Sequence, residues 1–257
     1  IKLDGNYPVG TANVALGDAA LDDGSLSGSY NTALGAASFG NLTSGTANLA
    51  VGAYAGQNHT TGSYNVFVGE EAAVGNTTGS SNTAVGRTAL YSNTTASYGT
   101  AVGFRAAYSN TTGADNTAMG GNSLYTNSTG NFNVASGYAS LRLNTTGSSN
   151  VGLGYEALKS NTTASYNTAV GYQSLKANTT ATNNVSIGAF SLALNTTGEA
   201  NTSVGLAAMD ANTTGSNNVA LGREALGGNT TASYNTAVGY QAGLNATTGS
   251  VNTFVGG

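Results

Sequence analysis

The chain has 257 residues, including 38 glycines and no cysteine or tryptophan; only 7% of its residues are charged, and its formal net charge is −4. Seven scattered basic residues cannot form the clustered patch that neutralises nucleic-acid phosphates, and without cysteine there is no disulfide, thiolate metal site or thiol nucleophile. No uninterrupted apolar run approaches the roughly 20 residues of a membrane span, so we expect no nucleic-acid partner and no membrane insertion.

Residues 1–10 are irregular and contain the single proline, Pro8, so we expect an N-terminal edge that caps the remainder. Residues 11–257 form one repeat domain. The chain starts at Ile1 without a methionine and stops at Gly257 in mid-repeat, and this pattern favours a segment of a longer fibre.

The repeat is a short phrase, Asn-Thr/Val-Ala-Val/Leu-Gly, that recurs fifteen times. Its first two glycines are 18 residues apart and all later ones are 17 apart. These glycines are Gly17, Gly35, Gly52, Gly69, Gly86, Gly103, Gly120, Gly137, Gly154, Gly171, Gly188, Gly205, Gly222, Gly239 and Gly256. We count positions within a repeat from its leading Asn, which is position zero and is replaced only once, by Gly99.

A helical repeat is excluded because glycine costs a helix about 1 kcal/mol and Asn, Thr and Ser compete for its backbone hydrogen bonds. A 17-residue unit is instead typical of one coil of a β-solenoid, with short strands joined by Gly and Asn turns. The sequence therefore predicts an all-β chain, a parallel β-solenoid (β-roll) of about fifteen coils. The glycine of each phrase should mark a backbone conformation or a close approach that a Cβ would block.

Position eight is usually leucine and follows a small residue, Ala or Ser. We expect these leucines to form either the core of one chain or the seam between chains that pack about a shared axis. They include Leu90, Leu124, Leu141, Leu158, Leu175, Leu192 and Leu226.

Two phrases carry a family resemblance: Asn-Thr-Ala-Val-Gly-Tyr-Gln-Ser-Leu at 167–175 and Asn-Val-Ser-Ile-Gly-Ala-Phe-Ser-Leu at 184–192. They resemble the head repeats of YadA-type trimeric autotransporter adhesins and the related repeats of phage and viral tail fibre proteins. The resemblance implies left-handed parallel β-rolls, a homotrimeric fibre and binding to host-surface ligands. The adhesin-head repeat is typically shorter, and the Asn-Thr-Thr stretch is an additional edge.

No catalytic or metal site is expected. The single histidine, His59, occupies a slot filled elsewhere by Asn93 or Asn161, and we interpret it as a surface substitution. The adjacent acids Asp22 with Asp23 and Glu70 with Glu71 lack a convergent partner for acid–base work, which favours a solvated role. The sequence therefore predicts a protein that is not an enzyme and needs no cofactor.

Aromatic residues recur at matching positions of successive coils. They would form either a platform for sugar rings or stacks that cover the core rim and chain contacts. The candidates for ligand binding are Tyr91, Tyr108, Tyr125, Tyr138, Tyr155 and Tyr172.

Two adjacent threonine columns, beginning at Thr60 and Thr61, are reminiscent of ice-binding solenoids, although in an extended strand one of the two would face inward. The same stretch contains Asn-x-Thr/Ser sequons, which either carry glycans or act as turns; we favour turns. The sequons begin at Asn41, Asn58, Asn76, Asn93, Asn110, Asn127, Asn144, Asn161, Asn178, Asn195, Asn212, Asn229 and Asn245.

The predicted function is that of a structural and binding fibre segment, a phage tail fibre or surface adhesin shaft that contributes to host-cell glycan attachment. Its expected partners are further copies of itself, as a homotrimer, and cell-surface carbohydrate, and its expected location is extracellular or on a virion surface. The alternatives are an ice-binding solenoid with threonine ladders and an extracellular filament subunit.

Overall fold

The computed structural model describes residues 11–256, so the predicted edge at residues 1–10 lies outside the described residues. The chain divides into two compact units, the first ending at Asn131 and the second beginning at Phe132. The described residues contain strands and turns and no helix. The prediction of a parallel β-solenoid is confirmed, with about 14 coils of about 17 residues.

Every strand has three residues. Unit 1 contains β1 (Val14–Leu16), β2 (Thr32–Leu34), β3 (Leu49–Val51), β4 (Val66–Val68), β5 (Thr83–Val85), β6 (Thr100–Val102) and β7 (Thr117–Met119). Unit 2 contains β8 (Val134–Ser136), β9 (Val151–Leu153), β10 (Thr168–Val170), β11 (Val185–Ile187), β12 (Thr202–Val204), β13 (Val219–Leu221), β14 (Thr236–Val238) and β15 (Thr253–Val255).

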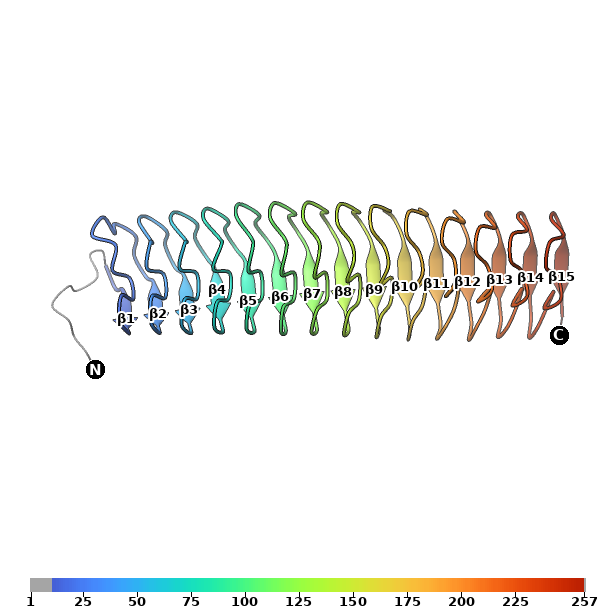
Figure 1. Cartoon of the computed structure of the whole chain (residues 1–257), viewed down its shortest axis with the longest axis horizontal. Coiled ribbons are helices and arrows are strands. Elements are labelled where there is room, and N and C mark those ends of the chain that lie inside the picture. The colour runs from blue at the N-terminus through green and yellow to red at the C-terminus, as the bar shows by residue number, and fades with distance from the viewer. Residues whose placement is uncertain (1–10, 257) are drawn as a thin grey trace. The chain divides into compact units, whose positions relative to one another are not determined.

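Within each unit, every strand pairs in parallel with its neighbours in chain order (Figure 1). The register follows the repeat, so Thr83 pairs with Thr100 and Thr168 pairs with Val185. Each residue therefore stacks on its equivalent in the next coil, as the constant spacing predicts.

The strands alternate between a buried centre and two outward neighbours, because successive side chains of a strand point to opposite faces. Ala84 at the centre of β5 has no exposed surface, whereas Thr83 and Val85 are partly exposed. The core is thin, since the buried central position is usually alanine. The remaining buried volume comes from positions seven and eight and from two columns of asparagine.

The two asparagine columns hydrogen-bond along the coils and across the core. At position zero, the Asn150 backbone N–H and Nδ2 both donate to Asn133 Oδ1. At position eleven, Asn161 Nδ2 donates to Asn144 Oδ1 at 2.8 Å. Both columns also donate to one carbonyl, since Asn133 and Asn144 each reach Gly147 O at 2.9 Å. Buried amides are costly unless they are hydrogen-bonded, and here each amide is shared between adjacent coils.

The phrase glycine meets both of its predicted requirements where another coil follows, whereas Gly256 at the last strand meets only the requirement for a positive φ. Gly154 has a φ of +132°, and a Cβ placed on it would lie 2.5 Å from the carbonyl oxygen of Gly171 in the next coil. A side chain at this corner would therefore be strained in conformation and would also collide with the backbone of the neighbouring coil.

Candidate functional site

The most extensive surface feature is what we call the outer sheet face, the outward side chains at positions one and three of every strand. Position one holds Thr, Val or Leu, and position three holds an apolar residue in every strand except at Ser136. Neither column contains a charged residue. Each side chain is half covered by its equivalents in the adjacent coils, yet Met119 remains 47% exposed and Ile187 39% exposed. In each unit this face is therefore uncharged and uncovered by other described residues, with one apolar column beside a column that mixes Thr with Val and Leu.

The predicted leucines lie on the opposite side of the strands, inside the coil. Leu124, Leu141, Leu158, Leu175, Leu192 and Leu226 have no exposed surface, and Leu90 has 2%. Of the two roles predicted for this position, the structure shows the core of a single chain. Side chains without accessible surface cannot contact another chain, so contacts between chains would need other residues.

The predicted tyrosines form two short stacks, one in each unit. In unit 1, Tyr91, Tyr108 and Tyr125 stack with centroid separations of 4.9 and 5.2 Å. In unit 2, Tyr138, Tyr155 and Tyr172 stack at 5.6 and 5.3 Å, with interplanar angles of 20° or less. Because each ring covers the face of the next, a sugar could reach only ring edges or the end of a stack. Of the two arrangements predicted for these aromatic residues, the structure therefore shows the one in which the rings stack on each other.

His59 is not a surface residue, and that interpretation is wrong. Its side chain has no exposed surface and packs against both Phe39 and Phe67, with ring centroids at 5.5 and 5.8 Å. Its Nε2 is 2.8 Å from Gly62 O, and its Nδ1 is 2.8 Å from Asn76 Nδ2. Nε2 must donate to the carbonyl and Nδ1 must accept from the amide, which requires the neutral ring. Burial lowers the pKa of His59. The sequence pattern did not reveal that this slot faces the core.

The sequons divide into two groups by burial. The asparagine is exposed at Asn41, Asn58 and Asn245 and buried in the ten others. The buried ones are members of the position-eleven column, so their Nδ2 atoms already donate to the neighbouring coil. The sequence favours turns over glycan acceptors for this stretch; the structure shows these ten asparagines as buried members of a hydrogen-bonded column.

The two threonine columns also differ from each other in exposure and in the hydrogen bonding of their hydroxyls. In the first, Thr60 Oγ1 donates to Thr77 O at 3.0 Å, and Thr162 Oγ1 donates to Thr179 O at 3.0 Å. The second column, which includes Thr61 and Thr163, is exposed. Only one threonine of each pair therefore presents a free hydroxyl, and two exposed columns on one face do not form here.

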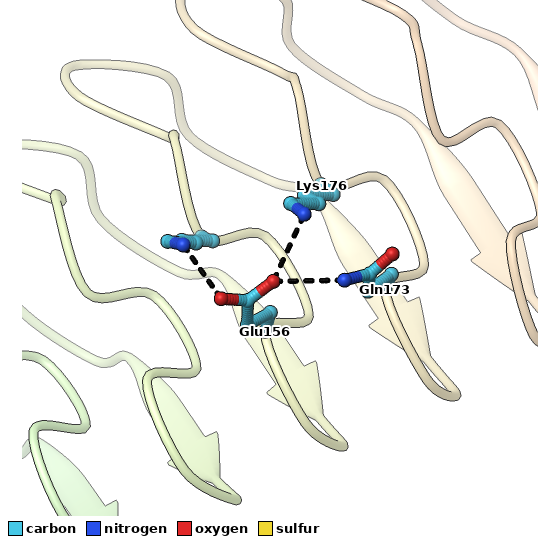
Figure 2. Close-up of polar contacts among 4 residues, drawn as sticks. Glu156, Gln173 and Lys176 are labelled. Carbon is cyan, nitrogen blue, oxygen red and sulfur yellow. Dashed lines mark hydrogen bonds and ion pairs between the residues drawn. The ribbon is translucent and has the colours of Figure 1, made fainter.

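An ion-pair network that sequence reasoning missed surrounds Glu156 in unit 2. Its Oε1 is 2.6 Å from Lys159 Nζ, and its Oε2 is 2.9 Å from both Lys176 Nζ and Gln173 Nε2. Figure 2 shows Lys176 and Gln173 converging on one carboxylate oxygen from the next coil. The side chain of Glu156 is only 10% exposed. The hydrogen bond from Lys159, aided by those from Lys176 and Gln173, lowers the pKa of Glu156 to about 2.

A sequence signal for this network was present. Glu156 and Gln173 are 17 residues apart, and so are Lys159 and Lys176, which places each pair on adjacent coils. The hydrogen bond between Glu224 and Gln241 repeats the first pairing later in unit 2. Of the adjacent acids, Asp22 and Glu70 are exposed, and Glu70 forms a surface pair with Arg87 at 3.0 Å. Asp23 is partly buried and accepts hydrogen bonds from the N–H and Oγ of Ser25.

Beside this network lies a surface cavity of about 430 Å³, which we call the Phe190 pocket. Its apolar part is formed by Phe190, Leu194 and three alanines, and its polar rim by Ser160, Gln173, Lys176 and Asp210. The volume falls within the roughly 300–1,000 Å³ that is typical of small-molecule sites. Burial raises the pKa of the Asp210 carboxyl above its ordinary value.

Within residues 11–256, no three His, Asp or Glu side chains are grouped so that they could hold a metal ion. Nor does this part of the chain contain a helix that is long and apolar enough to cross a membrane. A scan against protein-family models found no match, and searches of curated proteins and of solved structures found none either.

Proposed function

We propose that this chain is a structural and binding segment of an extracellular fibre, a phage tail fibre or surface adhesin shaft, in which identical chains associate through the outer sheet face. The observation that carries the proposal is the character of that face: it is uncharged and uncovered along the strands of each unit, and its position-three column is almost entirely apolar. Soluble monomers rarely expose large contiguous apolar patches.

Parallel sheets are ordinarily covered on both faces. In this chain the inner face is covered by the coil itself, and the outer face has no covering layer among residues 11–256. A second copy of the chain is the natural cover, because its outer sheet face has the same spacing between coils and no charge to desolvate. Closed symmetry is the usual outcome of such self-association. The resemblance to adhesin heads supports three chains and left-handed coils.

The role of such a fibre would be to project a receptor-binding tip and to bind host-cell glycan weakly along its length. Weak sites repeated on associated chains act together through avidity, so each need not be strong. An extracellular or virion-surface location accords with this role.

The test is the mass of the full chain in solution, measured by light scattering after size exclusion. We expect a stable assembly of three chains of 25.3 kDa each. Ile187→Glu combined with Leu221→Glu places repeated charges on the outer sheet face and should reduce the mass to that of one chain. Tyr234→Glu, at an exposed position outside this face, is the matched control and should leave the assembly intact.

A wild-type chain that runs only as a 25.3 kDa species would overturn the proposal. Assembly that persists in the double variant would show that another surface holds the chains together. Charges on Leu158 or Leu175 would not serve as a test, because these leucines are in the core and their replacement would unfold the coil.

A further inference from the structure

We propose that the Phe190 pocket binds one neutral pyranose ring of a glycan, with Phe190 as the platform under the sugar and Asp210, Gln173 and Lys176 as hydrogen-bonding partners. This deepens the glycan attachment that the proposed function includes, and it rests on that function only for the source of the sugar.

The pocket exists because small residues replace large ones on adjacent coils. Position nine holds Tyr91, Tyr108 and Tyr125 in three coils of unit 1, but it holds Ala193 between Lys176 and Asp210 in unit 2. Position six of the coil after Phe190 is Ala207. Ala193 and Ala207 therefore leave an open volume beside the Phe190 ring, bordered on both sides by charged residues.

Phe190 differs from the stacked aromatic residues of its unit. Its ring meets Tyr172 at an interplanar angle of 72°, whereas Tyr155 and Tyr172 lie within 10° of parallel. It is 42% exposed and borders the pocket. Phe190 is at position six of its coil, whereas these tyrosines are at position five, and the next residue in its own column is Ala207 rather than another ring. Phe190 thus offers a ring that no parallel ring covers, with an exposed fraction similar to those of Tyr138, Tyr155 and Tyr172.

The polar rim carries both donors and acceptors in fixed places. Glu156 binds Lys176 Nζ and Gln173 Nε2, and these two contacts orient both side chains. Because the Gln173 amide donates to Glu156, its Oε1 points away from the carboxylate and remains an acceptor (Figure 2). Asp210 supplies a second acceptor across the pocket, and Lys176 supplies donors.

These features select a neutral ring that has apolar C–H groups on one face and hydroxyls around its edge. A pyranose has this form: its C–H face packs on an aromatic ring, and its hydroxyls both donate and accept. A strongly anionic ligand would be repelled by Asp210, and a strongly cationic one would face Lys176. A purely apolar ligand would cover the partly buried carboxylate of Asp210 without offering it a hydrogen bond in place of water.

The experiment is saturation-transfer difference NMR on the full chain, which detects weak binding to a monomer or an assembly alike. The probes are methyl glycosides of glucose, galactose, mannose and N-acetylglucosamine, with cyclohexanol as a ring of similar size that carries a single hydroxyl. At least one glycoside should bind with a dissociation constant in the millimolar range, as one shallow site allows. Cyclohexanol should bind at least about fivefold more weakly.

Phe190→Ala should weaken glycoside binding by about fivefold or more, and it should keep the fold, because alanine occupies the same position with the same backbone conformation at Ala139 and Ala207. Asp210→Asn should weaken binding by a smaller factor. Phe104→Ala removes an equally exposed phenylalanine from unit 1 and is the control that should change nothing.

The proposal is overturned if no glycoside binds, if Phe190→Ala binds as well as the wild type, or if cyclohexanol binds as tightly as the best glycoside. A chain that binds a glycoside as a monomer would keep the pocket and remove the proposed self-association. An assembled chain that binds no glycoside would keep the proposed self-association and remove the proposed role of the pocket.

Discussion

Gly56 and Phe67 lie in adjacent coils, and the Phe67 ring fills the core space that a side chain on Gly56 would need. A Cβ on Gly56 would lie 2.7 Å from Phe67 Cδ2 and 2.6 Å from Phe39 Cε1. Position eight is leucine in most coils, and the strand centre is usually alanine. Here the large residue has moved to the strand centre and the small one to position eight. The same exchange recurs at Gly243 and Phe254, where the added Cβ would lie 2.6 Å from the ring.

Gly56→Ala should therefore destabilise the chain by about 1–3 kcal/mol through overpacking. Replacing all three residues with those of the other coils, as Phe39→Leu, Gly56→Leu and Phe67→Ala, should recover most of the loss. Urea denaturation gives the free energy of unfolding for each variant. A triple variant no more stable than the sum of its single changes would contradict this shared volume.

His59 should make stability depend on pH between neutral and mildly acidic conditions. Because burial lowers its pKa below the ordinary 6.5, the unfolded chain takes up a proton before the folded chain does. The contribution of the neutral ring is present above pH 6.5 and declines as the pH falls from 6.5 toward the folded-state pKa. The midpoint of urea unfolding, followed from pH 8 to pH 5.5, should decrease in the wild type.

His59→Asn is the matched control, since asparagine occupies this position in the following coils and does not titrate. Its unfolding midpoint should change less over the same pH range, whatever its stability at pH 8. An identical slope in both proteins would place the pH dependence elsewhere.

Asn229 ends the position-eleven column, and its Oδ1 is buried without a hydrogen-bond partner, because the next coil has Ala246 in that slot. Ala246→Asn would supply an Nδ2 donor in the same way that Asn229 supplies one to Asn212 at 2.9 Å. We expect a gain of about 1 kcal/mol in the free energy of unfolding. Ala246→Leu, which fills space without donating, separates the hydrogen bond from packing and should not give this gain.

Glu156→Gln should cost about 1–2 kcal/mol at pH 7, since it removes the charge from a mostly buried carboxylate that binds two partly exposed lysines. The pKa of Glu156 is lowered to about 2, so its contribution is present above the ordinary 4.5 and is lost as the pH falls through 2. The difference between wild type and variant should therefore shrink as the pH falls from 5 to 2.

Glu70→Gln is the surface counterpart of that change. Its pair with Arg87 is more than half exposed on both sides, so its loss should alter the free energy of unfolding by less than about 0.5 kcal/mol. Equal effects of the two substitutions would show that the Glu156 network is no stronger than a surface pair.

The repeat, the parallel register and the corner glycine can all be predicted from the amino-acid sequence. A constant spacing of 17 residues leaves each side chain facing its own equivalent, and the stacking of strands follows from that spacing alone. The spacing does not show whether the side chain at a given position points into the core, which is only a few side chains wide, or toward solvent. The turns contain residues such as Glu156, Leu158 and Tyr166 with positive φ, so inward and outward positions do not simply alternate there.

The folded chain was needed to show that the position-eight leucines and His59 are in the core, that the branched strand residues form the outer sheet face, and that the tyrosines stack on each other. The physical reason is that burial in a solenoid depends on the path of the turns, which brings Asn133 and Asn144 to one carbonyl across the core. The Phe190 pocket likewise requires four coils to be placed together, since Ser160, Lys176, Phe190 and Asp210 come from four successive repeats.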